Sequence, residues 1–168
     1  MWVKGQAQQA PVSEQNSQEL YTVFRARALG NREASAASGE TDSDMKLLYE
    51  FWSHFLCRNF NAKMYHEFRR CAHEDVRNNL GVGMNNLSSY YDEVLNSKKK
   101  VIPEILAHHY VELVKEESTS SDRPAFERLR AAWRNGALDM KSRKKIDNLV
   151  AGDPKLREEL ERAPQQKA

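Results

Sequence analysis

Two nine-residue stretches decide the fold: residues 64–72 read MYHEFRRCA, and residues 20–28 read LYTVFRARA, 44 positions earlier. Both stretches place an aliphatic residue, a tyrosine, a phenylalanine, an arginine and an alanine at the same offsets. Apolar residues three and four positions apart lie on one face of a helix. Each stretch is therefore predicted to be an amphipathic helix with an equivalent place in two copies of a repeat.

A second pattern repeats and supplies the partner helix of each copy. Residues 48–56 read LYEFWSHFL, and residues 87–95 read LSSYYDEVL. A weaker third copy runs through residues 105–114 and 126–133. Helix pairs spaced by about 40 residues are typical of HEAT-type solenoids. We therefore predict an all-α fold of three HEAT-like helix-turn-helix repeats that form a short α-solenoid, with a C-terminal helical extension.

The expected organisation has four parts. Residues 1–16 are rich in Gln, Ala, Pro and Ser and are predicted to be a disordered lead-in. Residues 17–137 are expected to hold the three repeats. Residues 138–162 are expected to be a basic linker and a C-terminal helix, with Asp153 as its N-cap. Residues 163–168 are predicted to be a disordered tail, and the polar start fits a fragment as well as a whole protein.

Composition excludes several classes of protein. The 168 residues suit one domain with tails. The 26 basic against 24 acidic residues leave a net charge of +2, which excludes a histone-like basic chain. No apolar run is long enough to cross a membrane, and the first residues lack the apolar core of a secretory signal. Two cysteines do not make a disulfide framework in a chain of this length, so a cytoplasmic or nuclear location is expected, with cytoplasmic as the prediction.

Catalysis and metal binding are not expected from the residue pattern. His54 and Cys57 are three apart on a predicted helix, but two ligands do not complete a metal site. Glu74 and Asp75 are adjacent, so on a helix they point about 100° apart and do not form an acid–base pair. The stretch at 81–83 is predicted to be a turn between helices and not a phosphate-binding loop. The sequence thus predicts a non-catalytic protein without a cofactor or metal.

Basic residues gather in the second half of the chain. Residues 123–145 hold eight basic and two acidic residues, and residues 98–100 are three lysines. Such runs are usually solvated helix faces, and the alternative is a surface that binds phosphates by displacing counterions. The aromatic residues are predicted to be mostly core by their spacing. Composition therefore predicts a helical-repeat binding module and does not choose between RNA and protein as its partner.

Several segments resemble a known family. Residues 51–56 (FWSHFL), 60–69 (FNAKMYHEFR) and 72–75 (AHED) are similar to FWSFFL, FNKKMYEEFR and ALED in the C-terminal helical repeats of La-related protein 1, the DM fifteen region. The resemblance covers roughly residues 17–161. It implies three HEAT-like repeats that bind the 7-methylguanosine cap and the first nucleotides of messenger RNAs that begin with a terminal oligopyrimidine tract, and that repress their translation.

The resemblance also implies a cap pocket, in which two tyrosines sandwich the base and a glutamate reads the guanine edge. The first tyrosine falls on Glu93, the second near Asn135, and the glutamate on Asn96. A methylated guanine is a delocalised cation that is held by stacking between rings. Because Glu93 removes one ring, this sandwich is not expected to form. A pocket shifted to other residues stays as an alternative.

The phosphate-holding positions of that pocket are substituted as well. Two family arginines fall on Glu50 and Ser89, and a third falls on Cys57, with Arg58 beside it. An aromatic position next to the first transcribed base falls on His54, which retains a ring for stacking. The positions that match the family are chiefly core positions, so the resemblance predicts the fold more directly than it predicts a cap site.

Two hypotheses of different classes follow. The first is a non-catalytic RNA-binding module that acts in messenger RNA translation or stability and contacts the RNA 5′ end, with or without a cap. The second is a protein-interaction scaffold within a translation-initiation or ribonucleoprotein complex, since solenoids offer large binding surfaces. A positive groove beside His54 would favour RNA, and a mixed or apolar patch would favour protein. The residues expected to contact RNA are His54, Arg58, Lys98, Lys99, Lys100, Arg130 and Arg134.

Overall fold

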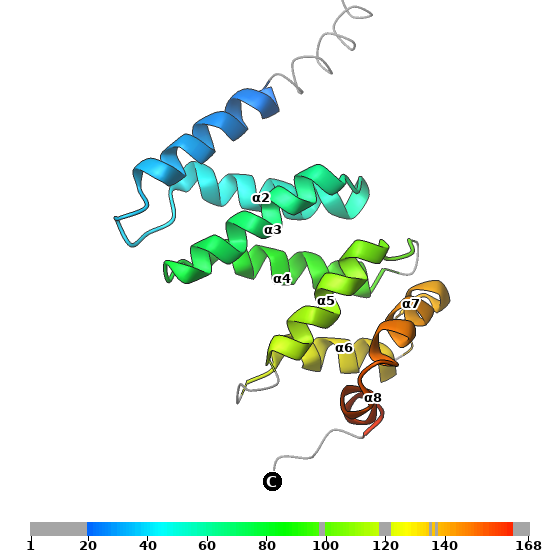
Figure 1. Ribbon diagram of the computed structural model, residues 1–168. Helices are drawn as coiled ribbons and strands as arrows, with labels where there is room; N and C mark the ends of the chain where they lie inside the picture. The colour runs from blue at the N-terminus through cyan, green and yellow to red at the C-terminus, as the bar shows by residue number, and fades with distance from the viewer. Residues whose placement is uncertain (1–19, 98–99, 118–121, 135, 137, 163–168) are drawn as a thin grey trace, which may run out of the picture. The chain divides into compact units, whose positions relative to one another are not determined.

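The computed structural model describes residues 20–97, 100–117, 122–134, 136 and 138–162 (Figure 1). Throughout these residues the regular structure is helical, and no strand occurs among them. The prediction of an all-α fold built from HEAT-like helical hairpins is therefore confirmed. Residues 1–16 and 163–168, which were predicted to be disordered, lie outside the described part of the chain.

The helices belong to two compact units, and the division between Leu87 and Ser88 falls inside one helix, α4. The first unit opens with a helix that includes residues 20–34. In both units, the helices that follow are joined by short connections. The remaining helices are α2 (Ser43–Arg58), α3 (Ala62–Arg77), α4 (Val82–Leu95), α5 (Glu104–Glu116), α6 (Pro124–Arg134), α7 (Met140–Val150) and α8 (Pro154–Glu161).

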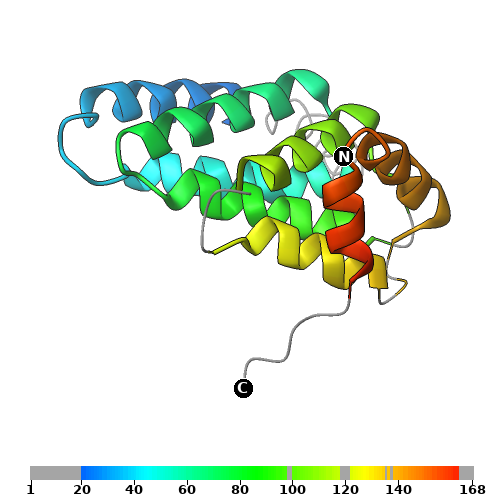
Figure 2. The same ribbon diagram turned by 60° about the horizontal axis from the view of Figure 1, so that its bottom comes forward.

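The first unit has an aromatic core. The rings of Tyr49, Trp52 and Phe68 are fully buried, and their centroids lie 5.6–6.0 Å apart. The indole of Trp52 donates to the Tyr21 hydroxyl at 3.0 Å and thereby ties α2 to the first helix. Figure 2 shows the first helix and α3 side by side, with α2 in the layer next to them. The predicted repeat helices thus pack on one another through their apolar stripes.

A buried carboxylate links three helices of this unit. Asp75 on α3 is 4% exposed. It accepts from the Tyr49 hydroxyl of α2 at 2.5 Å and from Arg32 Nε of the first helix at 3.0 Å. Arg32 also donates to Glu74 at 3.0 Å. A buried charge is tolerated only when it is paired and hydrogen-bonded. Burial and the bond to Asp75 both raise the pKa of Tyr49, so its hydroxyl stays a donor.

Gly83 is required by a close approach and does not lie in a turn. The prediction of a turn over residues 81–83 was wrong, because α4 begins at Val82 and contains Gly83. A Cβ atom at Gly83 would lie 2.5 Å from Cζ of the Tyr49 ring. Only glycine leaves room for this ring, because a buried tyrosine held by Asp75 has no space to move aside.

The second unit is held together by hydrogen bonds that reach across helices. The Tyr110 hydroxyl of α5 donates to the Ala125 carbonyl of α6 at 2.6 Å. The amide of Ile102, just before α5, donates to Ser142 Oγ of α7 at 2.9 Å, and Lys145 Nζ donates to the Ile102 carbonyl at 3.0 Å. Helix α7 packs on α5, and α8 packs on α6. The C-terminal helices therefore share a core with α5 and α6.

Helix caps in the second unit follow local sequence rules. Asp153 accepts from the Leu156 amide at 3.1 Å, with Pro154 in the first turn of α8, which confirms the predicted N-cap. Glu117 also caps a helix, although it stands eight positions before the first residue that it caps. Its carboxylate accepts from the first amides of α6, those of Ala125 and Phe126. Each cap satisfies amides that have no partner inside the helix.

The close approach at Gly83 predicts a stability difference between two neighbouring glycines. Gly83→Ala forces the added methyl group into the Tyr49 ring, so the free energy of unfolding is expected to fall by about 1–3 kcal/mol. Gly81→Ala is the matched control, because nothing lies within 4 Å of its Cβ position. Urea unfolding followed by circular dichroism measures both variants. Equal stability of the two variants would contradict the steric role of Gly83.

Candidate nucleic-acid interface

One face of α2 carries the first group of predicted site residues. Glu50, His54 and Arg58 are exposed and stand four positions apart, so they form a row along the helix. The opposite face of α2 is buried, with Trp52 and Leu56 in the core. The row combines one carboxylate, one imidazole and one guanidinium. Its charge is therefore mixed, which is the pattern that favours a protein partner, and the row also offers a ring and a cation one helical turn apart, which RNA binding uses.

Cys57 stands beside this row and is half-buried. Its thiol donates to the Ser53 carbonyl one turn earlier, with a sulfur–oxygen distance of 3.1 Å. The Ser53 hydroxyl in turn donates to the Glu50 carbonyl at 2.9 Å. Both side chains therefore bond to their own helix, so Cys57 does not supply the phosphate contact of the family arginine.

The outward face of α4 carries the predicted cap positions. Ser89 and Glu93 are exposed. Asn96, directly after the helix, donates its side-chain amide to the Asp92 carbonyl at 2.8 Å. The two rings of this helix, Tyr90 and Tyr91, are only 1–2% exposed. These rings have no surface on which a base could stack, and the exposed groups of the helix are polar or acidic.

Arg130 and Arg134 of α6 are engaged in structural contacts. Arg130 pairs with Glu127 and lies over the Phe126 ring, 5.3 Å from its centroid, with 16% of its side chain exposed. Arg134 donates to the Glu161 carbonyl at the end of α8 at 3.1 Å. A cation at this position also interacts favourably with the partial negative charge at the C-terminal end of α8. Both arginines therefore contribute to packing and capping within the second unit.

Three more cations of the basic stretch, residues 123–145, also make contacts within the second unit. Arg123 pairs with Glu159 of α8, and its guanidinium lies 4.0 Å from the centre of the Phe126 ring. Arg143 lies 4.7 Å from the Trp133 ring centre. Lys145 binds the Ile102 carbonyl. These three cations therefore contact neighbouring groups of the second unit, and they do not form the solvated helix face that such a run usually makes.

Two lysines of the same stretch face solvent. Lys141 and Lys144 are exposed on α7, three positions apart and thus neighbours on its surface. Within the described residues, neither side chain has a partner. Sequence reasoning counted both lysines in the basic run but did not single them out, because charge density does not tell a solvated lysine from a packed arginine.

The predicted lysine run is described only in part. Lys100 is exposed, whereas Lys98, Lys99 and the cap position Asn135 lie outside the described residues. Across the described ranges, no group of three or more His, Cys, Asp or Glu residues is placed to hold a metal ion. The helices in those ranges are also too short or too polar for any to span a bilayer.

The stacked contacts of Arg123 predict that this cation stabilises the fold. Arg123→Ala removes the ion pair with Glu159 and the contact with Phe126, and is expected to lower the free energy of unfolding by about 1–2 kcal/mol. Lys144→Ala removes the same charge from an exposed site and is expected to change it by less than about 0.5 kcal/mol. Urea unfolding compares the two variants. An Arg123→Ala protein as stable as the parent would show that the pair is not structural.

Comparison with protein families agrees with the repeat pattern. Residues 11–147 match the family model described as the LARP1 HEAT repeat region. The match spans most of the chain and includes α2, α3, α4, α5 and α6. It confirms the resemblance that residues 51–56, 60–69 and 72–75 indicated.

Proposed function

Because the chain belongs to the LARP1 HEAT repeat family, we propose that it is a non-catalytic RNA-binding module that acts in messenger RNA translation or stability. The single observation that carries this proposal is the exposed pair His54 and Arg58 on the outer face of α2. Proteins that bind single-stranded RNA combine rings, on which bases stack, with cations that hold phosphates. The pair supplies one group of each kind.

The spacing of the pair suits a single nucleotide. Side chains four positions apart on a helix have Cβ atoms about 5–6 Å apart, so a base over His54 places its phosphate within reach of Arg58. Lys100 of the predicted lysine run and the two solvated lysines of α7 are further sites for backbone phosphates. Each such contact is weak, because water and salt screen exposed charges.

The proposed binding mode does not include a cap sandwich. Glu93 stands where the resemblance implies a stacking tyrosine, and it is exposed. Tyr90 and Tyr91 of the same helix are buried in the core. A carboxylate attracts a cationic base only weakly in water and repels the cap triphosphate. We therefore propose that RNA binding is independent of the cap.

A protein-interaction scaffold is the second candidate function. Glu50 on α2 and Glu93 on α4 are exposed carboxylates. Both stand at positions that hold the cap or its phosphates in the family. A surface of mixed sign suits a protein partner better than a polyanion. This candidate would replace the first if the chain has no affinity for RNA at physiological salt.

Fluorescence anisotropy with short pyrimidine-rich RNAs, capped and uncapped, tests the proposal across a salt series. Arg58→Ala is expected to weaken binding roughly threefold to tenfold and to reduce the salt slope by about 1. His54→Ala is expected to weaken it by about fivefold or more, since a stacked base contributes about 1–3 kcal/mol. Capped and uncapped RNA are expected to bind alike.

Lys115→Ala is the matched control, because Lys115 is an exposed cation on α5 that is not among the residues proposed to contact RNA. It is expected to leave the affinity for RNA within about twofold of the parent. Equal losses in the control and in Arg58→Ala would show that binding follows net charge only. Tight binding that requires the cap would contradict the proposed mode, and absence of binding would favour the scaffold.

The exposed carboxylate beside His54 predicts a gain in affinity. Glu50→Gln removes a negative charge one turn from the proposed stacking site, so RNA is expected to bind about twofold to fivefold more tightly. Glu104→Gln removes an exposed carboxylate at the start of α5 and is expected to have a smaller effect. The same anisotropy assay measures both variants. An unchanged affinity in Glu50→Gln would place the RNA away from this row.

A further inference from the structure

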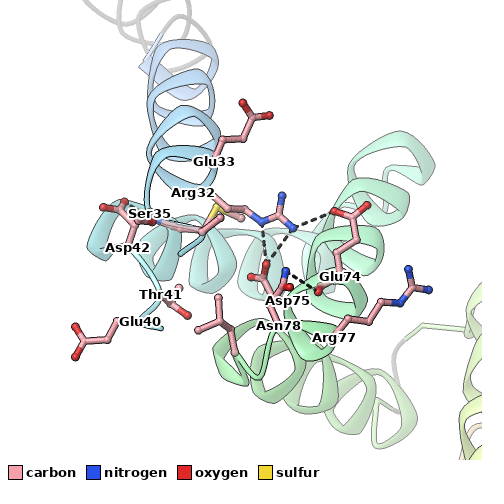
Figure 3. Close-up of a pocket in the computed structure, with 13 residues that line it drawn as sticks. Arg32, Glu33, Ser35, Glu40, Thr41, Asp42, Glu74, Asp75, Arg77 and Asn78 are labelled. Atoms are coloured by element: carbon pink, nitrogen blue, oxygen red, sulfur yellow. Dashed lines mark hydrogen bonds and ion pairs between the residues drawn. The ribbon is translucent and has the colours of Figure 1, made fainter. Parts of the chain in front are cut away.

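A pocket of about 370 Å³ opens in the first unit where helix ends meet (Figure 3). Its walls come from the end of the first helix, from the start of α2, and from the end of α3 with the turn that follows. Met45, which is buried, and Ala36 and Leu80 give it an apolar part. The pocket is separate from the exposed row of α2, which consists of Glu50, His54 and Arg58.

The charged groups around this pocket are predominantly acidic. Five carboxylates line it, against the two guanidinium groups of Arg32 and Arg77, which leaves an excess of three negative charges. Arg32 is already paired with two of these carboxylates. The first helix and α3 end here, with partial negative charge at their carbonyl ends, and α2 begins here, with the partial positive charge of its N-terminus capped by Asp42. The lining carboxylates are those of Glu33, Glu40, Asp42, Glu74 and Asp75.

Several carboxylate oxygens at the pocket have no partner within the described residues. Glu33 and Glu40 are exposed, and neither side chain is paired there. One oxygen of Asp42 caps the first amides of α2, and one oxygen of Glu74 accepts from Arg32. The second oxygen of each group remains available. Figure 3 shows Glu33 and Glu40 at the rim, extending outward from the pocket.

The inner wall is held rigid by the buried network. Asp75 is fixed from two sides, by the Tyr49 hydroxyl and by Arg32, and it is 4% exposed. Dashed lines in Figure 3 mark how Arg32 reaches both Glu74 and Asp75. A pocket whose wall is already ordered costs little conformational entropy when it binds a ligand. The carboxylates of this wall therefore hold their positions before any ligand binds.

We propose that this pocket docks a basic segment of a partner protein, through an arginine or lysine side chain. The cationic head lies at the mouth of the pocket, within the field of the surrounding carboxylates, and its methylene stem lies along Ala36 and Leu80, as long basic side chains do on apolar surface. Arginine fits best, because its planar fork of donors matches carboxylate oxygens. RNA does not suit this site, since its phosphates meet like charge.

A peptide titration followed by two-dimensional amide NMR spectra tests the docking site. The probe is the capped tripeptide Ac-Gly-Arg-Gly-NH2, and the matched probe carries neutral citrulline in place of arginine. The arginine peptide is expected to shift the amides of residues 33–42 and 74–80, and to bind at least about fivefold more tightly than the citrulline peptide. Equal shifts with both peptides would overturn the proposal.

Variants that remove charge test whether the arginine peptide binds at this pocket. The double variant Glu33→Gln with Glu40→Gln leaves the Asp75 network intact and is expected to weaken the arginine peptide by about fivefold. The control Glu104→Gln with Glu116→Gln removes two exposed carboxylates from α5 and is expected to leave binding unchanged. Equal losses in the two double variants would overturn the proposal.

A third arm separates this site from RNA binding. Short pyrimidine-rich RNA added to the parent protein is expected to leave the amides of 33–42 and 74–80 unshifted. Shifts there with RNA would assign the pocket to nucleic acid and overturn the docking proposal. The outcome is independent of the RNA proposal, because the anisotropy variants Arg58→Ala and His54→Ala lie on α2, outside the pocket lining.

Discussion

The first unit depends on the burial of one carboxylate, that of Asp75. An ionised carboxylate out of water is unfavourable unless donors surround it. Here the donors come from two other helices, the Tyr49 hydroxyl from α2 and the Arg32 guanidinium from the first helix. Each helix must therefore adopt its place for the charge to be satisfied. The network makes the packing of the three helices mutually dependent. Apolar contacts alone would couple the helices less strictly, because they are not directional.

Two surfaces follow from this constraint. With Tyr49 and Trp52 turned into the core, the row Glu50, His54 and Arg58 faces solvent on α2. At the helix ends, the same network forms the wall of an acidic pocket. One surface offers a ring and a cation, and the other offers carboxylates. Opposite chemistries on one unit would allow RNA and a basic protein segment to bind at separate places.

The second unit shows that a count of basic residues is a poor guide to a phosphate-binding surface. Arg123 and Arg130 flank the Phe126 ring, and Arg143 lies over Trp133. Guanidinium groups stack on rings and pair with carboxylates, so they serve as packing groups in this unit. The cations that stay exposed on α7 are lysines, Lys141 and Lys144, whose heads are strongly hydrated.

The sequence by itself determined the helices, the repeats and the family, because apolar spacing is a local property and the motif at residues 51–75 is specific. It also predicted the capping role of Asp153. Only the tertiary structure decided which charged groups are engaged. Asp75 is adjacent to Glu74 in the sequence, yet its partner Arg32 stands 43 positions away, and Arg123 pairs with Glu159 across 36 positions. Helical periodicity relates residues three or four apart, so no spacing rule predicts such pairs.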